Sequence, residues 1–246
     1  MSMAPHTLET PPGLRYVSLR YHTSGGDHLP WLPFTKVKYY TNVFVVKGGK
    51  VLLGYKKRGF GKGKYNGFGG KVEPGELPKD AALRELKEEA GISATLKHAG
   101  MLLFLSEDAE WAFEIEIYRA DDYEGEITES DEMRPEWFNL PSESVLASIQ
   151  GRTPRDISES TQPFSSDPSS TSAQDASTAS PIPYSQMWET DSIWLPLLLA
   201  KQKFVGRADF RKVRVQRQDG TEKVDEEKLE PYRWWYALAP EDPVGI

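Results

Sequence analysis

Residues 70–92 constrain this chain more than any other stretch. Gly70 is followed after five residues by Glu76, and after seven more by the run Arg84-Glu85-Leu86-Lys87-Glu88-Glu89-Ala90-Gly91-Ile92. In a helix, Glu85, Glu88 and Glu89 stand at positions i, i+3 and i+4, so they project from one face. Such crowded like charges repel one another unless a cation neutralises them, and Mg²⁺ prefers carboxylate, water and phosphate oxygens. The spacing therefore predicts a metal-binding helix.

The other positions of this stretch support the helix and its loop. Leu83, Leu86 and Ala90 mark a second face that can pack on a sheet. Glu76 lies where it could pair with Arg84, and the Gly70 carbonyl could complete a metal shell. A solvated acidic helix face would account for the three glutamates alone. It does not account for nine fixed positions over 23 residues, several of them chemically costly.

The complete pattern resembles the Nudix box, without a departure at any position. The resemblance implies an α/β fold, an α/β/α sandwich around a mixed sheet. It also implies hydrolysis of a nucleoside diphosphate linked to another moiety, with Mg²⁺ as cofactor and Mn²⁺ as the alternative. The metal ligands that it implies are Gly69, Glu85, Glu88, Glu89 and Glu132. The same four glutamates are the catalytic candidates, and the sequence does not choose the general base among them.

Three further segments resemble the oxidised purine nucleoside triphosphate hydrolases, the MutT-homologue branch of that family. They are residues 51–72, 129–138 and 187–204. This resemblance implies that 8-oxo-dGTP and 2-hydroxy-dATP are hydrolysed to monophosphate and pyrophosphate, which sanitises the nucleotide pool and avoids DNA damage. The substrate-binding residues that it implies are Thr41, Lys56, Phe60, Asn66, Phe68, Gly69, Gly70, Lys71, Phe104, Phe113, Trp188, Glu189, Thr190, Asp191 and Trp194.

Within this set, Asn66 corresponds to the purine-contacting asparagine and Trp188 to an aromatic lid. An amide can both donate to and accept from a purine edge, and an indole face can stack on any base. Phe113 stands where a Met is usual. Thr190 and Asp191 stand where the family has two adjacent aspartates, so one carboxylate remains and the other is a hydroxyl. Two carboxyl groups can share a proton, which a carboxylate and a hydroxyl cannot do in the same way. We therefore expect a substrate specificity that differs from that of the animal enzymes of the MutT-homologue branch.

Simpler interpretations exist for each of these residues. Trp188 and Trp194 could be core aromatics, Asn66 could cap a turn, and the basic run from Lys56 to Arg58 could be a solvated strand end. One competing phosphate motif fails outright. A P-loop needs Ser or Thr after Gly-Lys, and here Gly70-Lys71 is followed by Val72.

The chain reads as a single domain over residues 36–240. Residues 1–35 are rich in Pro, Gly, Ser and Thr and predict a flexible or loosely docked extension. Residues 150–183 predict a disordered insertion, because Ser and Thr dominate its centre and little apolar surface is available. Elsewhere the patterns predict strands at 39–46, 51–55, 94–106, 112–120, around 137–138, 208–216 and 232–238, and helices at 79–90 and 192–203.

Bulk composition narrows the function classes. The net charge of −7 argues against a general nucleic-acid binder, and the absence of cysteine removes thiolate nucleophiles and sulfur-ligated zinc. No apolar run is long enough to cross a bilayer, and the N-terminus lacks a signal pattern. We expect a small-molecule nucleotide substrate, no stable nucleic-acid binding, no membrane association and a monomer. The expected location is the cytoplasm, with entry to the nucleus open.

Two alternatives remain. The chain could be a Nudix hydrolase of another nucleoside diphosphate-linked substrate, such as a dinucleotide or capped RNA. It could also be a catalytically silent nucleotide sensor whose Ser/Thr-rich insertion serves as a phosphorylation or partner site. The complete set of Glu85, Glu88 and Glu89 argues against the sensor.

Overall fold

The structure, a computed structural model, describes residues 9–16, 18–151, 179–216 and 222–240. Its strands are β1 (Arg20–Gly25), β2 (Lys36–Lys47), β3 (Lys50–Lys56), β4 (Tyr65–Asn66), β5 (Lys97–Ser106), β6 (Trp111–Ala120), β7 (Met133–Asn139), β8 (Phe204–Gln216) and β9 (Glu222–Leu238). Its helices are α1 (Pro78–Ala90), α2 (Glu143–Gly151) and α3 (Asp191–Leu199), with a 3₁₀ turn η1 (Tyr184–Gln186).

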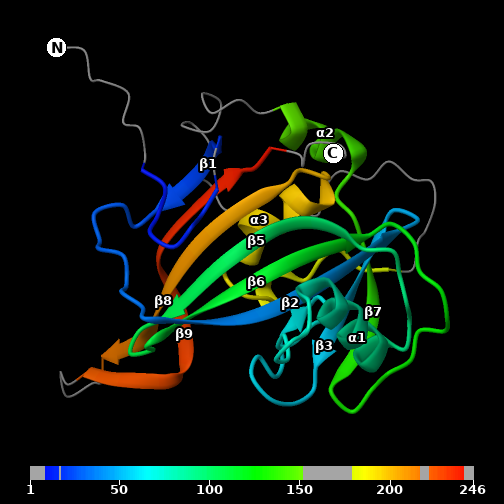
Figure 1. Ribbon diagram of the computed structural model, residues 1–246, viewed down its shortest axis with the longest axis horizontal. Coiled ribbons are helices and arrows are strands. Elements are labelled where there is room, and N and C mark those ends of the chain that lie inside the picture. Colours follow the sequence, from blue (N-terminus) through cyan, green and yellow to red (C-terminus); the bar gives the residue numbers. More distant parts are fainter. Residues whose placement is uncertain (1–8, 17, 152–178, 217–221, 241–246) are drawn as a thin grey trace.

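Within these residues, nine strands form one sheet in the order β1-β9-β8-β5-β6-β2-β3-β4, with β7 paired to β3 (Figure 1). β2 runs parallel to β6 and β5 parallel to β8, while the remaining pairs are antiparallel. The predicted mixed sheet is confirmed. Every predicted strand is present, and β8 and β9 are both longer than predicted.

Strand β2 explains the layers. Its side chains alternate between the two faces, as a strand requires. Val43 and Val45 join the apolar cluster under α1, whereas Phe44 and Val46 join the cluster that α3 covers. Both faces of this strand are therefore buried, and the sandwich with helices on both sides is confirmed.

Helix α1 ends where the sequence predicts and begins one residue earlier, at Pro78. Pro78 lies in the first turn, where a missing backbone N–H costs nothing. Gly91 ends the helix with φ of 74°, and its N–H donates to the Lys87 carbonyl. A Cβ on Gly91 would lie 2.2 Å from Thr128 Oγ1, so glycine is required for two reasons.

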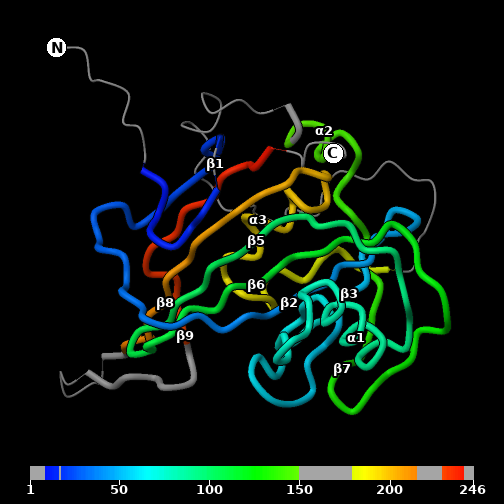
Figure 2. Tube along the Cα trace, viewed as in Figure 1, coloured from blue at the N-terminus to red at the C-terminus, as the bar shows by residue number. Residues whose placement is uncertain are grey.

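The prediction of a loosely docked extension at residues 1–35 is wrong for its described part. β1 pairs with β9 along the sheet edge, as Figure 2 shows. The fully buried Arg207 forms an ion pair with Asp209 and donates to the carbonyls of Pro12 and Leu32. The sequence does not reveal this attachment, because the arginine that bonds the N-terminal segment lies nearly 200 residues downstream.

The predicted insertion at 150–183 is shorter than expected at its ends. α2 extends to Gly151, and Pro181 forms a bridge with Asn139 of β7. Ile182 is buried in the main core. Residues 152–178, the centre of the predicted insertion, lie outside the described residues.

The predicted helix at 192–203 ends earlier, at Leu199. Lys201 has a φ of 57°, which takes the chain out of the helix.

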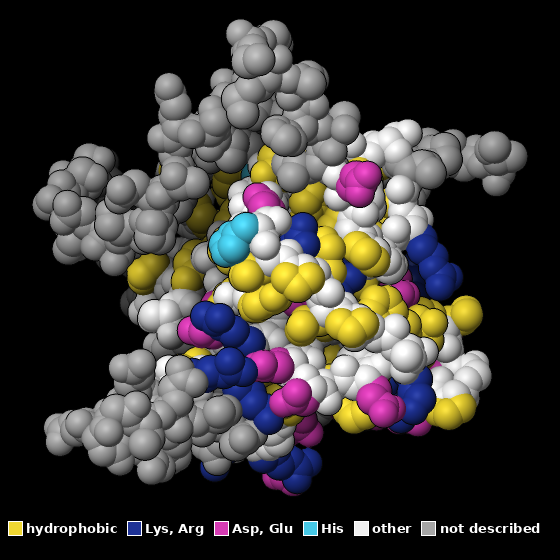
Figure 3. Space-filling model, turned by 90° about the vertical axis from the view of Figure 1, so that its left-hand side faces the viewer, with side chains coloured by type: hydrophobic (Ala, Val, Ile, Leu, Met, Phe, Trp, Pro, Cys, Tyr) yellow, Lys and Arg dark blue, Asp and Glu magenta, His cyan; other side chains and the backbone are white. Residues whose placement is uncertain are grey.

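Among the described residues, no helix is long and apolar enough to cross a membrane. Figure 3 shows positive and negative side chains intermingled on one side of the molecule, around apolar groups.

Candidate active site

Glu89 is the buried member of the three carboxylates on α1. Its side chain is only 6% exposed. The Gly69 N–H donates to its Oε2 at 2.8 Å, and Lys56 Nζ lies 3.4 Å from its Oε1. Burial raises the pKa of Glu89 to about 7, although the Lys56 cation and the Gly69 N–H favour the ionised form. The Glu89 carboxylate is therefore shielded from water, and its ionised form depends on the nearby Lys56 cation.

Lys56 joins Glu89 to a second carboxylate. Its Nζ also bonds Glu132 Oε1, and the Lys57 N–H donates to the Glu132 carbonyl at 2.8 Å. Pairing of β3 with β7 sets this geometry, because Lys56 lies opposite Met133. The structure thus brings the predicted acid of the 129–138 segment to the predicted helix.

Arg84 organises the opposite side of the carboxylate face. It bonds both carboxylate oxygens of Glu76, at 2.9 and 3.0 Å, and its Nη1 lies 2.8 Å from Glu85 Oε1. Its Nη2 also donates to the Lys71 carbonyl. These contacts raise the pKa of Arg84 far above its ordinary value. The predicted Glu76–Arg84 pair is confirmed.

The three helix carboxylates are not equivalent. The side chain of Glu88 is 59% exposed and lies 3.4 Å from Arg84 Nη1. Glu85 is mostly buried, with 16% of its side chain exposed. The helix face therefore points Glu85 and Glu89 into the site and leaves Glu88 at its rim.

Two glycines let the 65–71 loop approach the helix and β2. A Cβ on Gly70 would lie 2.3 Å from Glu85 Oε1, and one on Gly69 would lie 2.0 Å from the Thr41 carbonyl. The Gly70 carbonyl already accepts the Thr41 N–H at 2.9 Å. Of the two carbonyls that the sequence suggests as metal ligands, the Gly69 carbonyl is therefore the better candidate.

The donor set suits a hard divalent cation in its chemistry. Carboxylate and carbonyl oxygens are the ligands that Mg²⁺ and Mn²⁺ prefer. In the described part of the chain, no three Asp, Glu or His side chains lie close enough to one another to hold a metal ion. Arg84 bonds Glu85, and Lys56 bonds both Glu89 and Glu132. Each of these three carboxylates is therefore paired with a cationic side chain.

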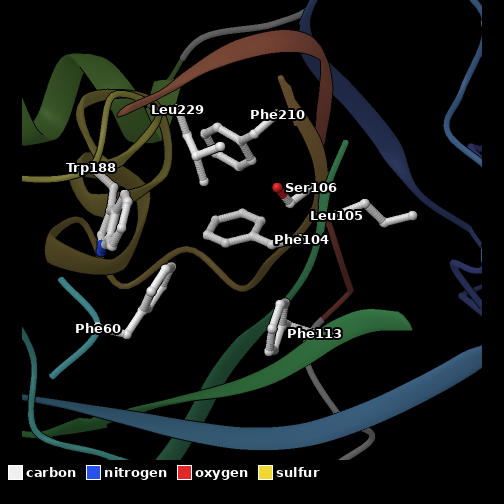
Figure 4. Close-up of a pocket in the computed structure, with 8 residues that line it drawn as sticks. All are labelled: Phe60, Phe104, Leu105, Ser106, Phe113, Trp188, Phe210 and Leu229. Atoms are coloured by element: carbon white, nitrogen blue, oxygen red, sulfur yellow. The ribbon is translucent and has the colours of Figure 1, made fainter. Parts of the chain in front are cut away.

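An aromatic pocket lies on the α3 face of the sheet (Figure 4). Four predicted substrate-binding residues line it together, namely Phe60, Phe104, Phe113 and Trp188. Figure 4 shows Phe60 and Trp188 on one side and Phe104 across from them. The remaining lining residues are Leu105, Ser106, Phe210 and Leu229.

Trp188 is held in place from several directions. Its ring stacks on Phe60, with centroids 5.1 Å apart and an interplanar angle of 23°. Lys64 Nζ lies 4.9 Å from the ring centroid and donates to the Met187 carbonyl. A Cβ on Gly61, which has a φ of 80°, would lie 3.2 Å from the indole. The predicted lid is therefore a fixed wall of the pocket in this structure.

Other predicted substrate residues are enclosed in the core. Trp194 is buried, stacks on Phe204 and donates its indole N–H to Asp191 Oδ1 at 3.0 Å. Phe68 is buried under α1. Both rings are enclosed by packing contacts, and substrate contact by Trp194 and Phe68 stays a prediction.

Thr190 and Asp191 lie beneath the lid. Both are almost fully buried, and Asp191 Oδ2 accepts the Trp188 N–H at 3.1 Å. Burial raises the pKa of Asp191 to about 7, against the effect of the Trp188 and Trp194 donors. Neither residue lines the aromatic pocket.

The remaining predicted substrate residues do not line the aromatic pocket. Asn66 lies at the end of β4 and is half-buried, and Thr41 is buried on β2. Lys71 is exposed, and Glu189 pairs with Lys64 at 3.4 Å.

Sequence reasoning missed two walls of the pocket. Phe210 and Leu229 come from β8 and β9, and Phe104 packs edge-on against Phe210 at 5.4 Å. The long apolar and aromatic alternation from Phe204 onward was the available signal. It shows the strand, but not which cavity the strand borders.

The chain matches the NUDIX domain family model over residues 38–150. It is 41% identical over 175 residues to the protein named oxidized purine nucleoside triphosphate hydrolase of Danio rerio, which covers 71% of this chain and 87% of that relative. The chain therefore belongs to the Nudix hydrolase family.

Two other comparisons add detail. The protein of the same name from Mus musculus is 38% identical, with the same coverage of 71% and 87%. A solved MutT protein from Bacillus halodurans has a TM-score of 0.45 at 19% identity, over 76% of this chain and 97% of that one.

Proposed function

We propose that this Nudix hydrolase converts oxidised purine nucleoside triphosphates into monophosphates and pyrophosphate. The observation that carries the proposal is that one connection links the aromatic pocket to the buried carboxylates. The β3–β4 connection begins at Lys56, which contacts Glu89, and reaches Phe60, which lines the pocket beside Trp188. The named relatives from Danio rerio and Mus musculus point to the same substrate class.

Different residues of the chain would bind the base, the phosphates and the metal ion. The aromatic walls would stack the base, and the Lys56 cation would add positive potential near the phosphates. We propose that Glu85, Glu88, Glu89, Glu132 and the Gly69 carbonyl hold a divalent cation, with Mg²⁺ the expected metal. A cation bound there would offset phosphate charge and lower the pKa of water. The reaction would add water across the anhydride bond between the α- and β-phosphates, which gives monophosphate and pyrophosphate, and one of the site carboxylates would accept the proton of water.

The decisive experiment is a substrate panel with product analysis in the presence of Mg²⁺. It would compare 8-oxo-dGTP, 2-hydroxy-dATP, dGTP, a dinucleotide and capped RNA. We expect the highest kcat/KM for an oxidised triphosphate, with monophosphate and pyrophosphate as products. A preference for dGTP would overturn the sanitising role, and cleavage of only a dinucleotide or capped RNA would move the enzyme to another Nudix substrate class.

A matched pair of variants tests whether the site is catalytic. Glu89→Gln keeps the size of the side chain and removes its charge, so turnover should fall by about 100-fold or more. Glu126→Gln makes the same change at an exposed position and should keep full activity. Wild-type protein that binds nucleotide without turnover would support the sensor alternative instead.

A further inference from the structure

Asn42 is a buried amide beside the predicted purine-contacting residue. It lies on β2 and is 8% exposed. The alternation of the strand places it on the same face as Tyr40 and Phe44. Tyr40 contacts Phe113 of the aromatic pocket at 5.4 Å, and Phe44 contacts Trp194 at 5.5 Å. Asn42 therefore lies on the face of β2 that borders the pocket.

The hydrogen bonds of Asn66 determine the orientation of its amide. The Gly67 N–H donates to Asn66 Oδ1 at 2.9 Å, and Asn42 Nδ2 donates to the same oxygen at 2.8 Å. A backbone N–H can only donate, so the atom that it meets must be the amide oxygen. Asn42 adds a second donor to this oxygen and makes the reversed orientation of Asn66 still less favourable.

This arrangement costs free energy that an apolar side chain would not cost. The Oδ1 atom of Asn42 is buried and has no hydrogen-bond partner among the described residues. A Cβ on Gly67 would lie 2.3 Å from that oxygen, so a glycine is needed beside it. A buried amide with an unpaired oxygen calls for a reason beyond packing.

The orientation leaves Asn66 with one chemical role. Its oxygen is occupied twice, and its Nδ2 has no acceptor among the residues that the structure describes. Asn66 can therefore offer N–H donors to a base, but it cannot offer an acceptor. An 8-oxo purine carries an N–H at N7 whatever its C6 group, so the two classes differ at C6. A 6-oxo purine presents an acceptor there, whereas a 6-amino purine places a donor there.

We propose that Asn42 is a positioning residue that locks Asn66 as a hydrogen-bond donor and thereby favours 6-oxo over 6-amino oxidised purines. This inference rests on the proposed function. Its measure is the ratio of kcat/KM for 8-oxo-dGTP to kcat/KM for 8-oxo-dATP, two substrates that both carry the 8-oxo group. We expect this ratio to be above one in the wild-type enzyme.

Two variants of the full chain test the lock. Asn42→Leu removes the donor, so the ratio should fall by about fivefold to tenfold, the effect of one hydrogen bond, mainly through KM for 8-oxo-dGTP. Asn42→Asp replaces the donor by an acceptor, which attracts Asn66 Nδ2 and turns its oxygen outward. The ratio should then fall below that of Asn42→Leu.

A control separates positioning from loss of packing. Val46→Ala creates a cavity on the same face of β2, away from Asn66, and should change melting temperature without changing the ratio. An unchanged ratio in Asn42→Leu, or an equal change in Val46→Ala, would overturn the inference. A wild-type preference for 8-oxo-dATP would also overturn the inference, and this measurement needs no variant. Turnover of neither oxidised triphosphate would overturn the proposed function itself.

Discussion

Phe60 and Trp188 stack on each other, with ring centroids 5.1 Å apart, although they belong to separate connections of the fold. At this separation no base can enter between the two rings. In the proposed enzyme, a purine would therefore stack on the side of the pair that faces Phe104 and the sheet (Figure 4). The pair acts as one wall of the pocket.

Trp188→Ala should weaken substrate binding more than chemistry. Loss of a stacked aromatic costs about 1–3 kcal/mol per base, so KM should rise by about tenfold or more. The carboxylates on α1 do not contact Trp188, and kcat should change little. Trp188→Phe keeps a ring in place and serves as the control. Steady-state kinetics with an oxidised purine triphosphate measure both effects, and an unchanged KM for Trp188→Ala would argue against stacking.

Arg84→Lys should impair catalysis although it conserves the charge. The planar guanidinium bonds both oxygens of Glu76 and also reaches Glu85, which a single ammonium cannot do. We expect kcat/KM to fall by about tenfold to 100-fold, as for other residues that orient metal ligands. Lys79→Arg, an exposed exchange on the same helix, should be silent. Equal activity of both variants would show that the loop needs no such clamp.

The sequence was most informative where a single local segment carries the function. Residues 70–92 form one loop and one helix, so spacing alone predicted the carboxylate face, the Glu76–Arg84 pair and the Gly91 stop. Spacing could not separate the three glutamates. Whether Glu89 is buried and Glu88 exposed depends on Lys56 and Gly69, which approach from other parts of the fold.

The sequence was least informative where distant segments meet. Trp188 and Trp194 lie in one short segment, yet one lines the pocket and the other packs between Phe44 and Phe204. Asn42 has no motif of its own and gains meaning only because β4 brings Asn66 to it. Tertiary pairing decides these roles.

Arg207→Met should destabilise the fold through the N-terminal segment. Asp209 would remain buried without its ion-pair partner, and the carbonyls of Pro12 and Leu32 would lose their donor. Breaking a buried pair costs about 3–5 kcal/mol, whereas an exposed pair contributes less than about 1 kcal/mol. Urea unfolding should therefore separate Arg207→Met from Arg211→Met, which breaks the exposed pair with Glu230. Similar midpoints would show that the segment is not anchored by Arg207.

Asp191 should make the folded protein less stable as the pH rises toward neutrality. Its pKa is about 7 in the folded protein, because burial disfavours the charge, and about 4 in an unfolded chain. Between these values the folded state holds a proton that the unfolded state has released. The resulting stability is complete below about pH 4 and is lost as the pH rises through about 7.

Asp191→Asn removes this titration but keeps the side-chain shape. Urea unfolding of the wild type and the variant from about pH 5 to about pH 8 should show a steeper loss of unfolding free energy in the wild type. Glu89, whose pKa is also about 7, titrates in both proteins, so the difference between the two curves isolates Asp191. Parallel curves would mean that Asp191 stays ionised throughout, with the Trp188 and Trp194 donors outweighing its burial.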